Sequence, residues 1–235
     1  MSEQDASRHL RVLSLGLLPY TAALTLQRSV ARARISGEIA EDVLLLLEHP
    51  PVVTLGRSSQ EKHLVASPEL LRAHGVELYE VERGGDVTFH GPGQLVGYPI
   101  IDLKRHKRDL HWYLRQVEEV LIRALGELGI TAERKAGLTG VWTAGRKIAS
   151  IGVHARDWVT WHGFALNVST DLSYFDLIVP CGIDGVVMTS VARELDASVD
   201  MAIVDDAVAR AFGSVFSLAP QRVELGALAS AVVPG

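Results

Sequence analysis

Residues 43–47 are all apolar, and this run constrains the fold more than any other feature of the sequence. A run of this length without a polar position is typical of a β-strand that is covered on both faces. Pro50 and Pro51 follow it and separate it from a second short strand, predicted over 52–55, because proline cannot donate a ladder hydrogen bond. The sequence therefore predicts a β-sheet at the centre of the molecule.

Helical spacing of apolar residues accompanies these strands. Over 110–128 an apolar stripe recurs every three or four residues, with Asp109 before it and Gly129 after it, and this is the clearest helix of the sequence. A second helix is predicted over 20–35, ended by Gly37. The other predicted elements are helices over 68–73 and 204–216 and strands over 10–15, 76–81, 147–154 and 163–168, the last two joined across 156–160. This alternation predicts a packed protein of α and β elements.

Composition limits the partners and the compartment. The net charge of −5 gives no basic field, so a nucleic-acid partner is not expected. A single cysteine cannot form an internal disulfide, and residues 1–9 are polar without a secretory apolar core. No apolar run approaches the roughly 20 residues that span a bilayer. We therefore expect a cytoplasmic protein that binds no membrane. The length of 235 residues allows one large domain or two small ones, and we favour one domain over residues 1–235.

Glycines are most concentrated between Arg83 and Gln94, where four glycines and a proline surround a short β-like stretch. Glycines gather where the backbone turns sharply or approaches a ligand closely. The segment lacks the ending of a phosphate-binding loop and the spacing of a dinucleotide fingerprint, so it matches no nucleotide motif. A tight structural hairpin explains the composition about as well as a binding loop does. Arg83 and His90 favour the binding loop slightly.

A second candidate segment lies at 145–152. If it is a strand, strict alternation places Lys147 on the opposite face from Ser150 and Gly152. A lysine at the start of a buried strand more often extends its ammonium to water at the edge than stays inside. The small residues at 149, 150 and 152 would nevertheless leave a groove lined by backbone. Such a groove could hold an extended acyl chain.

The third candidate is Cys181, the only cysteine. A lone cysteine is more often a small buried apolar residue than a nucleophile. Its neighbours favour the nucleophile, because Pro180 stiffens the chain and Gly182 lets backbone N–H groups approach a substituent on sulfur. A free thiol has a pKa of about 8.5 and needs an activating group. No histidine flanks Cys181 in the sequence, and a lysine could serve instead.

Two other site types are not supported. His90 and His162 could act as bases or ligands, but no cysteine and histidine spacing fits zinc, so we predict no metal. A serine hydrolase is disfavoured because the Gly-x-Ser-x-Gly elbow is absent from the sequence.

Taken together and in order, five blocks of sequence resemble the lipoyl(octanoyl) transferase family. The resemblance covers about residues 44–190, with little of the signature in the first dozen residues or after Ser190. The blocks are 83–95, 140–142, 147–152, 162–167 and 180–183.

The resemblance implies an α+β fold, with a central mixed β-sheet flanked by helices, as in biotin and lipoate protein ligases. It also implies that the chain is a single catalytic domain over 1–235 that transfers octanoyl from octanoyl-acyl carrier protein to a lysine. The acceptors would be lipoyl domains of 2-oxoacid dehydrogenase E2 subunits and the glycine cleavage H protein, in the first step of lipoate biosynthesis. No cofactor is expected, because exchange between thioesters is nearly isoenergetic.

By the same resemblance, Cys181 would carry the octanoyl thioester and Lys147 would form a dyad with it. Our hypothesis is that Lys147 first favours the thiolate and later accepts or relays the proton of the acceptor lysine. The residues implied to line the acyl and acceptor site are Arg83, Gly84, Gly85, Asp86, Val87, Thr88, Phe89, His90, Ser150, Ile151, Gly152, Gly163, Phe164 and Ala165.

Two other functions are possible alternatives to an octanoyl transferase. An ATP-dependent lipoate or biotin ligase on the same fold would activate the acid as an adenylate and would not need Cys181. A non-catalytic module would use the glycine-rich segment and the groove only to hold a lipoylated partner, without any covalent adduct.

Overall fold

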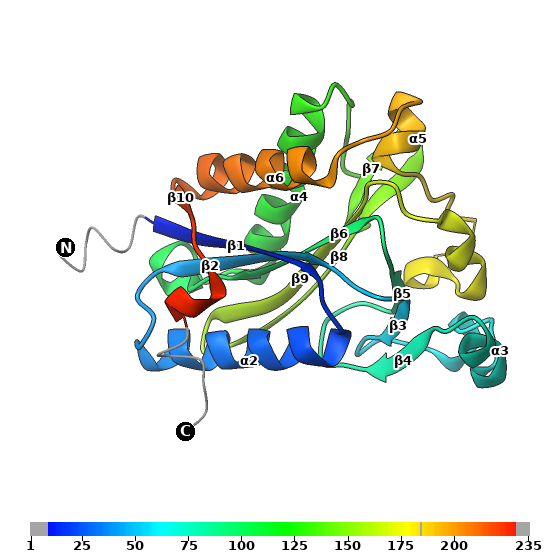
Figure 1. The fold of residues 1–235 in the computed structure, drawn as a ribbon, viewed down its shortest axis with the longest axis horizontal. Helices are drawn as coiled ribbons and strands as arrows, with labels where there is room; N and C mark the ends of the chain where they lie inside the picture. Colours follow the sequence, from blue (N-terminus) through cyan, green and yellow to red (C-terminus); the bar gives the residue numbers. More distant parts are fainter. Residues whose placement is uncertain (1–8, 184, 229–235) are drawn as a thin grey trace.

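The computed structural model of the chain describes residues 9–183 and 185–228, which form two β-sheets with helices around them (Figure 1). The polar N-terminal segment up to residue 8 and the C-terminal end of the predicted domain lie outside the described residues. The larger sheet has seven strands. In spatial order these are β10 (Ala219–Arg222), β1 (His9–Leu17), β2 (Asp42–Glu48), β6 (Gln94–Ile100), β9 (Val159–Asn167), β8 (Arg146–Arg156) and β7 (Val141–Thr143).

The larger sheet is mixed, as predicted. Its first three strands pair in parallel, and the remaining pairs are antiparallel. The run at 43–47 forms β2, which is buried along both faces. Val43, Leu45 and Leu47 join one apolar cluster, and the alternate residues Leu44 and Leu46 join another. The prediction of a strand covered on both sides is therefore confirmed.

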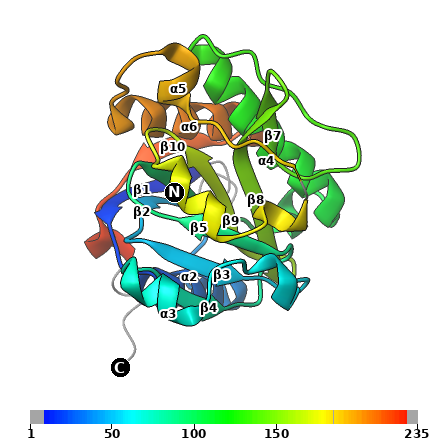
Figure 2. The same cartoon turned by 90° about the vertical axis from the view of Figure 1, so that its right-hand side faces the viewer.

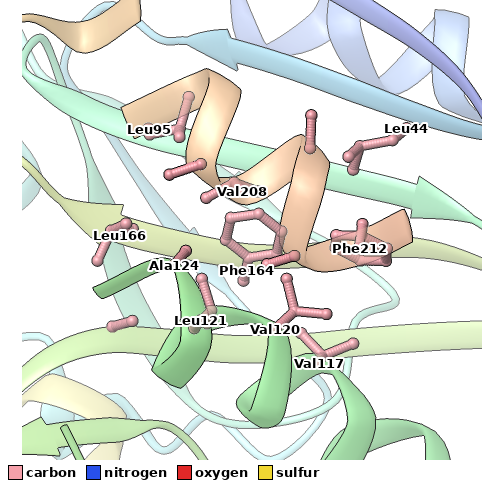
Figure 3. Close-up of a cluster of buried hydrophobic side chains, with 14 of the residues drawn as sticks. Leu44, Leu95, Val117, Val120, Leu121, Ala124, Phe164, Leu166, Val208 and Phe212 are labelled. Carbon is pink, nitrogen blue, oxygen red and sulfur yellow. The ribbon is translucent and has the colours of Figure 1, made fainter. Parts of the chain in front are cut away.

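Helices form the two outer layers (Figure 1). Helix α2 (Tyr20–Ser36) covers one face of the large sheet, and α4 (Leu110–Glu127) and α6 (Met201–Phe216) cover the other. Figure 3 shows the second layer, where side chains of α4 and α6 meet those of β2, β6 and β9. Within the described ranges, no helix combines the length and the apolar composition that a membrane crossing needs.

The helix ends follow the local rules that predicted them. The Asp109 side chain accepts a hydrogen bond from Trp112 N at the start of α4, and Gly37 ends α2 with a left-handed φ of 85°. Helix α3 (Pro68–Ala73) begins after Ser67, whose side chain accepts from Leu70 N. Each cap satisfies a backbone group that the helix leaves unpaired.

The smaller sheet contains β4 (Glu77–Glu80), β3 (Val52–Leu55) and β5 (Val87–His90), in that spatial order. It has its own apolar cluster, shared with α3 and with the 3-10 turn Leu172–Leu177. The glycine-rich segment thus contains β5, a strand that is buried along its whole length. Figure 2 shows this small sheet beside the 172–183 segment.

Strands β8 and β9 are joined as a hairpin, as predicted, but the predicted extent of the connection, 156–160, was wrong because both strands are longer. Two residues, Asp157 and Trp158, make the whole turn, with φ values of 52° and 64°. Left-handed values at both central residues match the twist of an antiparallel pair and let it continue to its end. The sequence concealed this turn because neither residue is glycine.

Strict alternation along β8 was also wrong. Trp142 of β7 pairs with Lys147, whereas Val141 pairs with Ala149, so Ile148 is an extra residue on β8. Such a β-bulge shifts the alternation by one residue. Lys147 therefore lies on the same face as Ser150 and not on the opposite face.

The sequence did not reveal several short or interrupted elements. They are β6, β7, β10, helix α5 (Val191–Leu195), and the 3-10 turns Glu61–His63, Leu103–Arg105, Pro180–Gly182 and Leu225–Leu228.

Candidate active site

A cavity of about 240 Å³ lies where the small sheet meets the large sheet. Strands β6, β8 and β9 form one side, and β5 with the segment leading into it forms the other. Most of the predicted site residues come together here. Those that line the cavity are Arg83, Gly85, Asp86, Thr88, His90, Ser150, Ile151, Gly152, Gly163, Phe164, Ala165 and Cys181.

Four predicted residues do not line the cavity. Val87 and Phe89 point into the apolar cluster of the small sheet, since alternate residues of a strand face opposite sides. Gly84 donates its N–H to Val153 O at 2.8 Å, which fastens the glycine-rich segment to β8. Lys147 lies behind the wall and reaches Cys181 from there.

Lys147 and Cys181, which are 34 residues apart in the sequence, are in contact. Lys147 Nζ donates to Cys181 Sγ at 3.0 Å, and Ser150 Oγ lies 3.9 Å from the same sulfur. Lys147 is 0% exposed, and its Nζ lies 5.1 Å from the centroid of the Trp142 ring. The alternative in which Lys147 extends its ammonium to water is therefore wrong. A buried ammonium needs a partner, and a thiolate can supply the negative charge.

The backbone around Lys147 fixes its direction. Lys147 N donates to Val187 O at 2.8 Å and its carbonyl accepts from Thr189 N at 2.9 Å. A Cβ atom at Gly140 would lie 2.9 Å from Lys147 Cε, so glycine leaves the room that the side chain occupies. Together with the bulge at Ile148, these contacts hold the ammonium beside the sulfur.

Cys181 lies in a tight turn with an unusual backbone conformation. Its φ and ψ are 57° and 19°, and φ of Gly182 is 65°. The left-handed region is unfavourable for a residue with a Cβ atom, and such strain is concentrated at functional sites. Gly182 N donates to Val179 O at 2.9 Å, which closes the turn. The turn presents the partly exposed sulfur to the cavity.

Arg83 places a positive charge in the cavity wall. It is 7% exposed, and its guanidinium donates to Thr54 Oγ1, to Thr54 O and to Gly84 O, all of which are neutral acceptors. Burial lowers the pKa of Arg83. A Cβ atom at Gly56 would lie 2.7 Å from Arg83 Nη1. Nothing in the local sequence indicated that Thr54 and Gly56 support this side chain.

His90 presents a neutral ring to the cavity. Gln94 Nε2 donates to Phe89 O and Asn167 Oδ1, so its Oε1 accepts from the Nδ1–H of His90 at 2.8 Å. Burial lowers the pKa of His90 to about 3. Nε2 of His90 is therefore a hydrogen-bond acceptor at neutral pH.

The cavity wall also contains residues outside the predicted set of acyl-site and acceptor-site residues. Tyr98 hydrogen-bonds to His49 Nε2 at 2.7 Å, and burial raises its pKa well above the usual value. His162, which the sequence suggested as a base or ligand, also lines the cavity, and burial lowers its pKa. Tertiary folding brings in the other members from outside the recognised blocks. These are Gly137, Leu138 and Thr139.

Comparison with known families gives a match over most of the chain. The model of the lipoyl protein ligase A/B catalytic domain matches residues 19–213.

Curated relatives share about half of the sequence. An octanoyltransferase of Koribacter versatilis is 54% identical over 212 residues, which cover 88% of this chain and 84% of the relative. An octanoyltransferase of Gloeobacter violaceus is 50% identical and covers 94% of this chain and 96% of its own. An octanoyltransferase of Rubrobacter xylanophilus is 51% identical, and the match covers 92% of this chain and 96% of the relative.

Solved structures share the fold at low sequence identity. A lipoate-protein ligase A bound with ATP superposes with a TM-score of 0.78 at 19% identity, covering 92% of this chain and 89% of that one. A second match is a chain from the structure of a bipartite lipoate protein ligase and its E2 lipoyl domain from Thermoplasma acidophilum. It superposes with a TM-score of 0.76 at 19% identity, covering 92% of this chain and 87% of that one. The predicted resemblance to the ligase fold is confirmed.

Proposed function

Because the chain belongs to the octanoyltransferases of the lipoyl protein ligase A/B catalytic family, we propose that it transfers octanoyl through a thioester on Cys181. It is an acyltransferase of protein lipoylation. We propose octanoyl-acyl carrier protein as the donor. The proposed acceptors are lipoyl domains of 2-oxoacid dehydrogenase E2 subunits and the glycine cleavage H protein. The observation that carries the proposal is the 3.0 Å contact between Lys147 Nζ and Cys181 Sγ.

Loading begins from the thiolate. The Lys147 ammonium favours the negative charge on the Cys181 sulfur, which attacks the carbonyl carbon of the donor thioester. A carbon–sulfur bond forms to Cys181 and the bond to the carrier breaks. The carrier leaves as a thiolate and takes a proton from Lys147. One thioester replaces another, so the step needs no nucleotide.

Acylation changes the environment of Lys147. The sulfur no longer carries charge, and Lys147 has given its proton to the departing carrier, so its amine can accept a proton in the second half of the reaction. The acceptor amine then attacks the thioester carbonyl. Its proton passes to Lys147 and the Cys181 thiolate leaves, which restores the resting pair. The product is an amide, which makes this half of the reaction favourable.

The cavity wall suits an extended acyl group. Ser150 to Gly152 on β8 face Gly163 to Ala165 on β9, and the small side chains leave the backbone accessible. Arg83 adds a fixed positive charge to the wall of the same cavity. A positive charge placed in advance favours the oxyanion of the tetrahedral intermediate over the neutral carbonyl.

Intact-protein mass spectrometry after incubation with octanoyl-acyl carrier protein tests the proposal. We expect one octanoyl adduct that hydroxylamine removes on the wild type, and none on Cys181→Ala. An adduct that persists in Cys181→Ala would remove Cys181 from the mechanism. ATP-dependent charging of free octanoate that survives in Cys181→Ser would instead favour a ligase.

Lys147→Met tests the dyad separately, because methionine approximates the length of lysine without its charge. We expect kcat/KM for octanoyl transfer to fall by about 10² to 10⁴, the range for loss of acid–base assistance. Lys107→Met is the matched control, since Lys107 pairs with Asp109 on the surface. Near wild-type rates in Lys147→Met would exclude the proposed role.

A further inference from the structure

We propose that His63 and Asp86 are positioning residues that hold the Cys181 turn, and with it the sulfur, beside Lys147. The inference deepens the proposed function and rests on the role of Cys181 given there. His63 lies outside the five blocks that resemble the transferase family, in the 3-10 turn Glu61–His63.

The two side chains form a closely bonded pair at the edge of the site. His63 Nδ1 lies 2.6 Å from Asp86 Oδ2, and each residue is only 9% exposed. The other carboxylate oxygen, Oδ1, accepts from Val87 N at 2.7 Å. Because Val87 begins the buried strand β5, the carboxylate has a fixed orientation, and it in turn orients the imidazole.

The pair packs directly against the residue that follows the nucleophile. A Cβ atom at Gly182 would lie 2.8 Å from His63 Nδ1 and would also overlap Asp86 Oδ2. Only a residue without a side chain fits against the pair, and the φ of 65° at Gly182 favours glycine as well. The turn therefore rests on the His63–Asp86 pair.

The backbone of the same segment holds the chain that leads into the turn. Val179 N donates to His63 O at 2.8 Å, and Leu64 bridges Ile178. Val65 N and Ala66 N both donate to the carbonyl oxygen of Leu177. The approach to Cys181 is thus fastened to residues 63–66 from end to end.

The turn needs this support because its backbone is strained. Cys181 has a left-handed φ of 57°, a conformation that persists only where surrounding contacts enforce it. Lys147 is held independently by β8 and by residues 187–189. Loss of the His63–Asp86 pair would therefore leave the ammonium in place and release the sulfur from it.

The experiment compares His63→Leu with His63→Asn. Leucine fills a similar volume without a polar atom, whereas the asparagine amide can still donate to Asp86. Because Cys181 is the only cysteine, the rate of iodoacetamide alkylation against pH reports on its thiolate alone. We expect alkylation of His63→Leu at pH 7 to be at least tenfold slower than in the wild type, with the profile displaced to higher pH. His63→Asn should recover most of the rate.

Octanoyl transfer provides the second readout. In His63→Leu we expect kcat to fall at least tenfold, with KM for the donor within twofold of the wild type, because the cavity itself is unchanged. His111→Leu, an exposed histidine on α4, is the control and should change neither measurement. A purely structural role would lower the melting temperature and leave the alkylation profile in place.

Three outcomes decide the inference. A folded His63→Leu with the wild-type alkylation profile would overturn it. If His63→Leu does not fold, Asp86→Ala removes the same bond and should give the same displacement, and an unchanged profile there would overturn it equally. Alkylation needs no acyl donor, so a displaced profile supports the positioning role even if no octanoyl adduct forms and the proposed function fails.

Discussion

At the scale of single residues, Lys147 combines complete burial with a charged side chain. Removing an ammonium from water costs several kcal/mol, and only a well-placed partner offsets this. Its Nζ has two such contacts, the Cys181 sulfur at 3.0 Å and the face of the Trp142 ring. The surrounding structure therefore holds the Lys147 ammonium against the sulfur and the ring and away from solvent.

Two glycines give a matched test of packing against the site. A Cβ atom at Gly56 would overlap Gly85 O and lie 2.7 Å from Arg83 Nη1, whereas one at Gly126 meets nothing within 4 Å. We expect Gly56→Ala to lower the unfolding free energy by about 1–3 kcal/mol and to reduce transfer by displacing Arg83. Gly126→Ala, within α4, should raise the unfolding free energy by about 0.5–1 kcal/mol.

Urea unfolding gives the unfolding free energy of both variants, and an octanoyl transfer assay gives their activity. Gly56→Ala with wild-type stability and activity would show that Arg83 and the neighbouring backbone adjust freely.

The candidate site was predicted only in part. The glycine-rich segment and Cys181 could be found because unusual residues are adjacent in the sequence. His63, Thr54 and Tyr98 could not, because histidine, threonine and tyrosine have ordinary roles in most positions. Only the pairing of β3 with β5 brings Thr54 to Arg83, and only the pairing of β6 with β9 brings Tyr98 to the cavity wall.

At the scale of elements, the turn of the β8–β9 hairpin is made by two residue types that are poorly suited to its backbone conformation. Asp157 and Trp158 both have positive φ, where a side chain is unfavourable and Asn-Gly is preferred. We expect Asp157→Asn with Trp158→Gly to raise the unfolding free energy by about 1 kcal/mol. Leu103 N donates to the backbone carbonyl of Trp158, so the double variant retains this hydrogen bond.

Thermal or urea unfolding of the double variant is the measurement, and transfer activity should stay at the wild-type level. A fall in stability would mean that the Trp158 side chain contributes more by packing than its backbone costs.

The elements that the sequence predicted are those with long, regular patterns. Helix α4 shows its apolar stripe over five turns, and β2 is a pure apolar run. Strand β6 was missed because Gly97 and Pro99 interrupt its pattern. The Phe164 ring packs against Gly97 and leaves no room for a side chain there. This packing requirement interrupts the apolar pattern by which the strand could have been predicted. Strands β7 and β10 are too short for periodicity to indicate them.

At the scale of the whole molecule, stability should fall as the solution becomes acidic. Burial lowers the pKa of His49 to about 4 and that of His90 to about 3, against about 6.5 in an unfolded chain. Below pH 6.5 the unfolded state therefore binds protons that the folded state does not. As the pH falls below about 6.5, each of these histidines should therefore lower the unfolding free energy by about 1.4 kcal/mol per pH unit, until the pH reaches its folded pKa.

Urea unfolding between pH 7 and 5 measures this slope, in a range above the titration of most carboxylates. His49→Gln should remove one of these histidine contributions and make the dependence shallower. A wild-type stability that stays constant from pH 7 to 5 would show that these rings protonate in the folded protein.

The edges of the seven-stranded sheet bear on how copies of the chain meet one another. At one edge, Trp142 of β7 exchanges both backbone hydrogen bonds with Glu133, at 2.8 and 2.9 Å. At the other edge, β10 has only four residues, and Pro220 removes a donor from it. An uncovered edge is a template on which a second molecule can add its own strand, and this is a common start of aggregation. With β7 bonded to Glu133 and β10 shortened, these two edge strands offer a neighbouring molecule little open backbone on which to assemble at high concentration.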